Sequence, residues 1–204
     1  MSNNLIPNNP SIKLSIVATL YNSSPYIDEF YNRITDVATS LFQEEYEIIL
    51  VDDGSHDDSL NLAIEFSKKH SKTKVLELSR NFGHHQAMYA GLKESKGDFI
   101  FLIDSDLEEQ PEWLYEFIRK MESENADVIF GQQIQRKGSL FEKLSGLIWY
   151  KVFNLITGMN HPLNITTARL MNRNYLNGFL QFKEKELVIS CLWLITGFKQ
   201  IPHP

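Results

Sequence analysis

The stretch DFIFLIDSDLEEQPEWLYEFIRKM, residues 98–121, contains the pattern that decides the fold of this chain. It begins with a run of apolar residues that lacks the polar alternation of a half-exposed strand, which is typical of a parallel strand covered on both faces. An acidic segment then leads to Pro111 and Glu112, a favourable start for a helix, and to apolar residues spaced by three and four. The stretch therefore predicts a buried strand that is followed by a one-sided helix.

The same alternation recurs along most of the chain. Similar apolar runs predict strands at residues 13–20, 46–51, 74–78 and 127–130, and helical spacing predicts one-sided helices at residues 27–41 and 60–67. Strands that alternate with helices indicate a doubly wound α/β fold, with a mostly parallel sheet flanked by helices.

The remainder of the chain has a different pattern. Residues 139–158 predict a long apolar helix, and residues 183–198 predict a second helical stretch. We therefore expect three parts: a flexible tail at residues 1–11, an α/β core at residues 12–138, and a helical region at residues 139–204 that is cut short at its end.

The composition and net charge exclude some classes of function. The 204 residues are 43% hydrophobic and 23% charged, as in an ordinary globular protein. A net charge of −6 without a basic block argues against nucleic-acid binding. The single cysteine, Cys191, lies in an apolar run, so we expect a buried thiol and a reducing compartment. No apolar run reaches the length of about 18 residues that a membrane span needs.

Polar residues follow three of the predicted strands directly, and ligands of open α/β sheets bind at that edge. Asp52 and Asp53, followed by Gly and Ser, have carboxylates that can accept hydrogen bonds from a nucleoside, or they form a turn and helix cap. After the next strand, Arg80 offers a cation. His84 and His85 follow as metal ligands or as loop and capping residues.

The third cluster, Asp104, Asp106 and Glu108, places carboxylates at alternate positions. In an extended chain alternate side chains share a face, so the three could converge on one hard divalent cation. The alternative is a solvated acidic loop. The chain has neither a P-loop nor a G-x-G-x-x-G motif, so phosphates would need a metal bridge instead of a cradle of amides.

Taken together, five ordered stretches over residues 13–139 resemble the family 2 glycosyltransferases, which have the GT-A fold. The likeness is to the branch with dolichol-phosphate mannose synthase and the bacterial polyprenyl-phosphate glycosyltransferases. The stretches are SIVATLYN, YEIILVDDGSHDDSL, LSRNFGHHQAMYAGL, GDFIFLIDSDLEEQPEWL and DVIFGQQIQRKGS.

This resemblance implies roles by position. Donor-binding roles fall on Thr19, Tyr21, Asn22, Asp52, Asp53, Arg80, Asp104 and Arg136. Asp104 and Asp106 match the metal-binding DxD motif for Mg²⁺ or Mn²⁺, and Glu108 stands where close relatives have Gln. Arg169 and Arg136 match basic positions near a donor or acceptor phosphate, which makes Arg169 a candidate catalytic residue. The implied reaction is a single displacement with inversion.

The acceptor is less clearly indicated. The polyprenyl-phosphate branch has G-D-F-R where this chain has Thr166-Thr167-Ala168-Arg169, so Thr167 replaces the expected aspartate. A phosphate acceptor is already an anion, whereas a sugar hydroxyl normally needs a base. Other family members place that base about eleven residues before a glycine, which makes Glu186, upstream of Gly197, the candidate.

We therefore expect an inverting, metal-dependent glycosyltransferase that moves a sugar from a UDP- or GDP-sugar to a lipid-linked acceptor. It would act at the cytoplasmic face of a membrane, as in bacterial surface-polysaccharide assembly. The helix at 139–158 would pack on the domain or rest on the membrane surface. Alternatives are a soluble sugar or protein acceptor, a non-catalytic nucleotide-sugar binder, and a nucleotidyltransferase, which would need an early glycine-rich loop.

Overall fold

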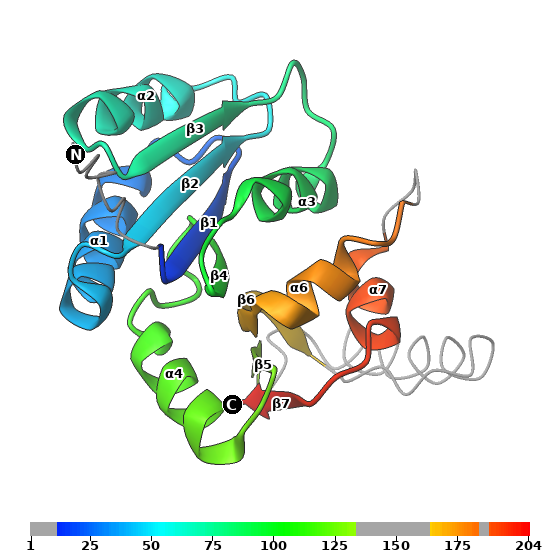
Figure 1. Ribbon diagram of the computed structural model, residues 1–204. Coiled ribbons are helices and arrows are strands. Elements are labelled where there is room, and N and C mark those ends of the chain that lie inside the picture. Colours follow the sequence, from blue (N-terminus) through cyan, green and yellow to red (C-terminus); the bar gives the residue numbers. More distant parts are fainter. Residues whose placement is uncertain (1–11, 134–163, 184–187) are drawn as a thin grey trace, which may run out of the picture.

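One sheet organises the computed structural model, which describes residues 12–133, 164–183 and 188–204. In these residues seven strands lie in the order β3-β2-β1-β4-β6-β5-β7 (Figure 1). β6 is antiparallel to its neighbours β4 and β5, and the other neighbouring strands are parallel, which confirms the predicted mostly parallel sheet. The strands are β1 (Leu14–Leu20), β2 (Tyr46–Asp52), β3 (Thr73–Glu77), β4 (Phe99–Asp104), β5 (Val128–Gln132), β6 (Ile165–Asn172) and β7 (Gln200–His203).

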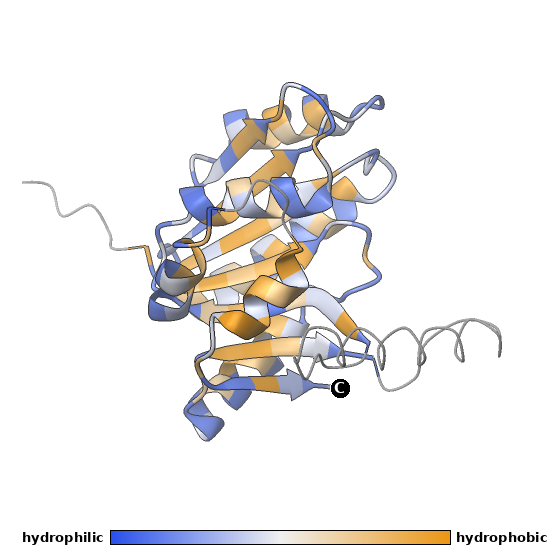
Figure 2. Ribbon diagram, turned by 90° about the vertical axis from the view of Figure 1, so that its right-hand side faces the viewer, coloured by the Kyte–Doolittle hydropathy of each residue, from blue (hydrophilic) through white to orange (hydrophobic). Residues whose placement is uncertain are grey.

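Helices cover both faces of the sheet (Figure 1). One face packs against α1 (Ile27–Phe42), α2 (Ser59–Lys69) and α4 (Trp113–Glu124). The other packs against α3 (His84–Glu94), α6 (Arg173–Phe179) and α7 (Ile189–Ile195). Along β1, Ile16 and Ala18 enter the first core and Val17 enters the second. The central strands β1 and β2 are buried at every position, and these strands and β4 are mostly apolar, as the hydropathy colouring in Figure 2 shows.

The C-terminal part of the chain differs from the helical region that the sequence indicated. It supplies the short helices α6 and α7, but also β6, which inserts between β4 and β5, and β7 at the edge of the sheet. The predicted boundary near residue 138 therefore does not divide the sheet. Asp127 helps to join the last strands, because its carboxylate accepts hydrogen bonds from the Asn172 side chain (2.7 Å) and the Lys199 N–H (3.0 Å).

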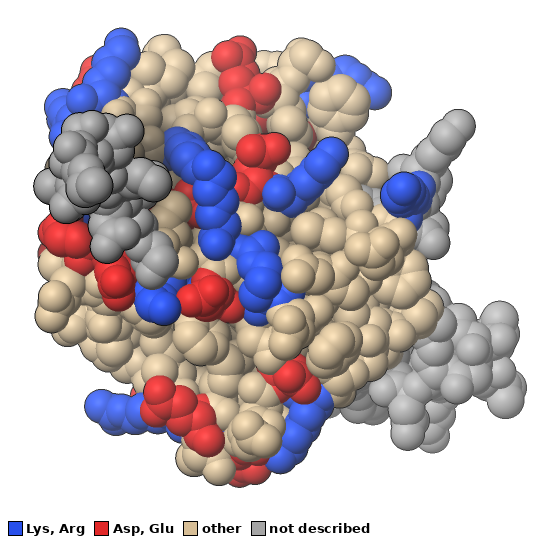
Figure 3. Space-filling model, viewed as in Figure 1, with Lys and Arg blue, Asp and Glu red and all other residues tan. Residues whose placement is uncertain are grey.

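Other predictions from the sequence concern the N-terminal tail, the long apolar helix, the single cysteine and membrane spans. The tail at residues 1–11 and the helix at residues 139–158 lie outside the described residues. Cys191, expected to be buried, is partly exposed because it lies on the outer side of the short helix α7. No helix within the described ranges is long and apolar enough to cross a bilayer. On the face drawn in Figure 3, acidic and basic side chains are interspersed.

Candidate active site

The carboxyl edge of the sheet brings the predicted clusters together. Parallel pairing sets Thr19 of β1 opposite Asp104 of β4, and Leu20 opposite Asp52 of β2. The chain adds β2 and β3 on one side of β1 and then returns to add β4 on the other side. The gap between β1 and β4 is thus the topological switch point, where open α/β sheets bind their ligands.

Asp104 is held by two side chains from other elements. The Thr19 hydroxyl donates a hydrogen bond to Asp104 Oδ1 over 3.0 Å. His84, the first residue of α3, has Nε2 3.5 Å from the same oxygen and Nδ1 3.4 Å from the Thr19 hydroxyl. The structure thus places Thr19 as a partner of the carboxylate. It also brings the His84 side chain into the site, beside Asp104 and Thr19, and not into a separate loop or a helix cap.

The acidic loop does not have the geometry that its spacing predicted. The strand ends at Asp104, and Leu107 has a left-handed φ of 62°, so the chain bends instead of continuing extended. Asp106 accepts a hydrogen bond from the Glu108 N–H over 3.0 Å. Among the described residues, no three acidic, histidine or cysteine side chains are grouped closely enough to hold a metal alone. The described residues therefore form no preformed cage of three ligands, and the convergence of the three carboxylates on one cation stays a prediction.

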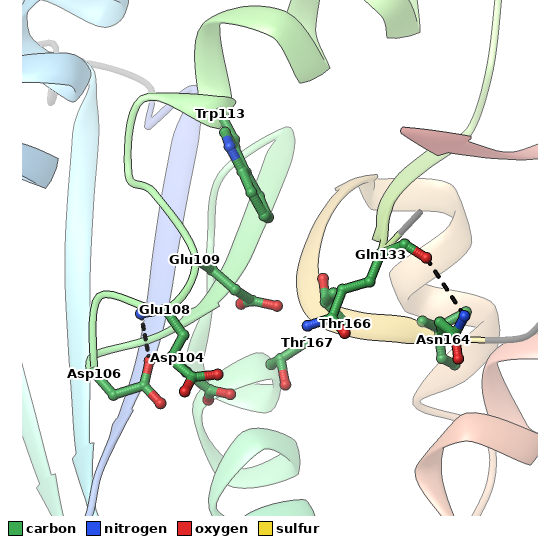
Figure 4. A pocket seen from close by; sticks show the side chains of 10 residues that line it. Asp104, Asp106, Glu108, Glu109, Trp113, Gln133, Asn164, Thr166 and Thr167 are labelled. Carbon is green, nitrogen blue, oxygen red and sulfur yellow. Dashed lines mark hydrogen bonds between the residues drawn. The ribbon is translucent and has the colours of Figure 1, made fainter. Parts of the chain in front are cut away.

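The three carboxylates nevertheless line one cleft of about 350 Å³. In Figure 4 they lie on one side of it, at and beyond the end of β4, and Thr166 and Thr167 of β6 lie on the other. Trp113, at the start of α4, forms part of the wall. The cleft therefore combines negative charge with hydroxyl groups at the switch point.

Glu109 is a residue of the cleft that the sequence interpretation missed. Its side chain is only 7% exposed, and its Oε1 accepts a hydrogen bond from the Ala168 N–H over 3.0 Å. Oε2 has no hydrogen-bond partner in the described part of the chain. Burial raises the pKa of this carboxyl, and the neighbouring charge of Asp104 adds to the effect. Glu109 thus joins the acidic loop to β6.

Asp52 and Asp53, both predicted to bind the donor, have different surroundings. Asp53 is 3% exposed, and its two oxygens accept hydrogen bonds from the Phe82 N–H (2.7 Å) and the Gly83 N–H (3.0 Å). Asp52 uses only Oδ2, which accepts from two N–H groups of its own turn, and its buried Oδ1 has no partner among the described residues. Of the two, only Asp52 retains a carboxylate oxygen that is not already engaged.

The remaining donor-binding candidates lie around the rim of this edge. Tyr21 has a side chain that is 48% exposed. Asn22 accepts a hydrogen bond from the His56 N–H over 3.0 Å and so links the first loop to the second. The exposed Arg80 stacks its guanidinium on the Phe82 ring, 4.3 Å from the ring centroid. Arg136 and Glu186 lie outside the described residues.

Arg169 is not in the acidic cleft. Successive residues of β6 point to opposite faces, and Arg169 lies over the Trp193 ring of α7 on the side of α3 and α6. There it lines a second cavity of about 400 Å³. The Arg169 side chain therefore lines a different space from Glu109 and Thr166, and its expected role near a donor or acceptor phosphate stays a prediction.

Residues 15–179 match the model of glycosyl transferase family 2. The chain belongs to this family. A Mycobacterium tuberculosis protein named as a glycosyltransferase is 44% identical over 191 residues, which are 94% of this chain and 56% of that protein. The Bacillus subtilis protein YkcC, an uncharacterized glycosyltransferase by name, is 34% identical over 93% of this chain and 58% of its own length. The family 2 chain thus spans less than two thirds of these relatives.

Solved structures are similar to this family 2 chain in fold. The mannosyltransferase PcManGT from Pyrobaculum calidifontis, in complex with GDP-Man and Mn²⁺, has a TM-score of 0.66 at 16% identity, over 95% of this chain and 55% of that one. S. aureus TarS has a TM-score of 0.65 at 20% identity, over 94% of this chain and 35% of that one. With the seven-stranded sheet, these similarities confirm the predicted GT-A fold.

Proposed function

We propose that this chain carries the donor-binding and catalytic core of an inverting, metal-dependent glycosyltransferase that uses a UDP- or GDP-sugar. The observation that carries the proposal is the acidic cleft at the switch point, where Asp104, Asp106 and Glu108 line one space at the end of β4. Family membership over residues 15–179 supports the reaction class, and it weighs against the nucleotidyltransferase.

The side chains of the cleft fit a hard divalent cation, Mg²⁺ or Mn²⁺. Such ions take oxygen ligands, and Mg²⁺ is often held by only one or two carboxylates together with substrate phosphates and water. Asp104 and Asp106 would be the protein ligands, and Glu108 a further oxygen donor at the rim. The absence of a three-residue cage in the described residues agrees with a site that the donor completes. A bound cation would neutralise the charge that builds on the departing nucleoside diphosphate.

The other residues of the edge would orient the donor. Thr19 would position Asp104 through the hydroxyl that it donates to this carboxylate. The free oxygen of Asp52 would accept a hydrogen bond from the nucleoside, because its other oxygen is already used. Tyr21 and Arg80 would form the outer wall. Asp53 would act indirectly, by fixing the loop that carries Arg80.

We propose a lipid-linked acceptor, a polyprenyl phosphate or glycan intermediate, at the cytoplasmic face of a membrane. An acceptor that is already an anion requires no base. Thr167 lines the cleft where the polyprenyl-phosphate branch has an aspartate, so this position departs from the pattern of that branch. A sugar hydroxyl acceptor would instead require a carboxylate such as Glu186. The chain spans only 56% and 58% of the length of two relatives. The lipid-linked acceptor is therefore proposed for the whole protein and not for this chain alone.

Thermal unfolding with a panel of nucleotide sugars, with and without Mn²⁺, tests the proposal. A donor at about 100 times its Kd should add about 2.7 kcal/mol of stability, or about 5–10 °C in Tm for a chain of this size. Asp106→Asn should remove the Mn²⁺-dependent part of the shift. Glu94→Gln, a matched change of an exposed acid at the end of α3, should keep it. No shift with any nucleotide sugar would refute the proposal, and an unchanged Mn²⁺ response in Asp106→Asn would refute the role of that ligand.

A further inference from the structure

Asp104 is in contact with α3, a helix that contributes no residue to the wall of the acidic cleft. The helix begins at His84, and the side chain of this residue lies beside Asp104 and Thr19. Gly83 occupies the N-cap position, so the His84 ring is not needed as a cap. The side chains of His84 and Asp104 are 44% and 26% exposed, so a small ligand can reach both from solvent.

The hydrogen bonds of Thr19 assign the proton of the His84 ring. A carboxylate can only accept, so the single proton of the Thr19 hydroxyl points at Asp104 Oδ1, 3.0 Å away. The Thr19 oxygen is then an acceptor toward His84 Nδ1, 3.4 Å away, and this nitrogen carries the ring proton. Nε2 of the neutral ring is therefore left with a lone pair and no proton.

Two acceptor atoms thus face each other at the end of β4. His84 Nε2 and Asp104 Oδ1 are 3.5 Å apart, which is longer than an N–H···O hydrogen bond of about 2.7–3.2 Å. Two atoms that bind one cation at about 2.1 Å each lie about 3.0–3.5 Å apart. A carboxylate oxygen and a nitrogen lone pair at this separation repel each other unless a positive charge lies between them.

We propose that His84 Nε2 is a ligand of the divalent cation at this site, together with Asp104, and that it makes the site prefer Mn²⁺ or Co²⁺ to Mg²⁺. The presence of a cation rests on the proposed function. A histidine that binds a metal usually donates its other ring N–H to an oxygen, as Nδ1 does here to Thr19. Imidazole nitrogen suits transition metals, whereas carboxylate and phosphate oxygens suit Mg²⁺. Asp106, diphosphate oxygens and water would supply the other ligands.

The alternative is a protonated His84 that forms an ion pair with Asp104. Such a pair at a partly exposed position contributes little to stability, and the imidazolium would compete with a cation for the carboxylate. The two interpretations predict opposite effects of His84→Gln on Mn²⁺ binding. Loss of a ligand weakens the binding, whereas loss of a competing charge strengthens it.

Pulsed electron paramagnetic resonance of Mn²⁺ on the full chain tests the proposal directly. With isotope-labelled histidine, and with Mn²⁺ alone or together with UDP or GDP, we expect coupling of the ion to a histidine nitrogen. His84→Gln should abolish this coupling, whereas His85→Gln, a matched change of the next residue, should keep it. Bound Mn²⁺ without histidine coupling, or coupling that His84→Gln leaves intact, would overturn the proposal.

Calorimetric titration under the same conditions gives the metal preference. We expect the unaltered chain to bind Mn²⁺ about tenfold or more tightly than Mg²⁺. His84→Gln offers an oxygen in place of the nitrogen, so it should lower the Mn²⁺ affinity about fivefold or more and change the Mg²⁺ affinity less than about twofold. Equal losses for both ions would indicate a structural role, and tighter Mn²⁺ binding would indicate the ion pair. Either result would overturn the proposal.

These measurements also distinguish the two proposals. If Asp106→Asn removes Mn²⁺ binding but no histidine coupling appears, the role of His84 fails and the proposed function stands. If coupling that depends on His84 appears but no nucleotide sugar stabilises the chain, the proposed function fails and the cation site stands. If Mn²⁺ does not bind with or without nucleotide, the role of His84 fails together with the proposed metal dependence.

Discussion

Asp53→Asn tests whether this aspartate fixes a loop or binds the donor directly. In the folded chain each oxygen of the Asp53 carboxylate accepts its own hydrogen bond, one from the Phe82 N–H and one from the Gly83 N–H. An asparagine has only one acceptor, so its NH₂ group would face the other backbone N–H. The loop that leads into α3 would then lose its attachment to the end of β2.

The loss of stability expected for Asp53→Asn follows from the two hydrogen bonds that this carboxylate accepts. A hydrogen bond to a charged group contributes about 1.5–3 kcal/mol, and Asp53→Asn removes one and makes the other neutral. Since Asp53 is 3% exposed, water cannot replace the lost acceptor easily. We expect a loss of about 2–3 kcal/mol in the free energy of unfolding, or about 4–12 °C in Tm for a chain of this size.

Asp52→Asn is the matched control. Asp52 uses a single oxygen, Oδ2, for both of its hydrogen bonds. An asparagine can place its own oxygen there and keep both bonds, with its NH₂ at the unpartnered position. We therefore expect a loss below about 1 kcal/mol. Nucleotide-sugar binding should nevertheless weaken, because an acceptor has become a donor.

Urea unfolding gives the free energies, and hydrogen exchange reports on the amides of Phe82 and Gly83. In Asp53→Asn these two amides should exchange faster before the rest of the sheet does. The reasoning would be refuted if Asp53→Asn unfolded like the unaltered chain and lost nucleotide-sugar binding, since Asp53 would then be a direct ligand.

Three further changes have expected outcomes. Hydrogen bonds from two serine residues outweigh the effect of burial and lower the pKa of Asp57 to about 2. Asp57→Asn should therefore cost about 1–2 kcal/mol in urea unfolding above the unfolded pKa of about 4, and the difference should vanish as pH falls through 2. Gly131→Ala would place a Cβ 2.3 Å from the Thr166 hydroxyl, which should cost about 1–3 kcal/mol. Adding Thr166→Ala should recover most of that loss in a double-mutant cycle. Thr19→Val removes the hydroxyl that donates to Asp104, so the Mn²⁺-dependent shift in Tm should need about three to ten times more Mn²⁺.

Strands and helices with a full apolar pattern could be predicted because burial leaves a local periodic signal. α1 and α4 are examples, since each faces a single core with large side chains. α3 was missed because its buried stripe is made of small or irregular residues, such as Ala87 and Gly91. Gly91 lies so close to the sheet that a Cβ there would meet Val17 at 2.4 Å. Such close packing depends on the partner surface, which is distant in sequence.

The acidic cluster shows that residue spacing alone does not predict the direction of each side chain. Glu108 and Glu109 are adjacent and identical in type, yet Glu108 is exposed and Glu109 is buried against β6. The difference arises from the left-handed turn at Leu107 and from contact with Ala168, more than fifty residues along the chain. Neither feature has a local signature, because leucine rarely adopts a positive φ. The position of the cleft could be predicted from strand order, but the direction of each carboxylate could not.

β6 decides how the family resemblance applies to this chain. A motif aligned in sequence assigns Thr167 and Arg169 to one phosphate site, and two residues that are two positions apart would share a face of a regular strand. In the structure Thr167 lines the acidic cleft and Arg169 lines the second cavity, and the pairing of β6 with β5 is irregular beside them. In the structure the chain here is a strand paired on both sides, and Arg169 and Ala168 lie on opposite faces of it. Glu109 binds the Ala168 N–H on the side of the acidic cleft, and Trp193 covers Arg169 on the other side. The side chains of this segment are therefore divided between two adjoining cavities.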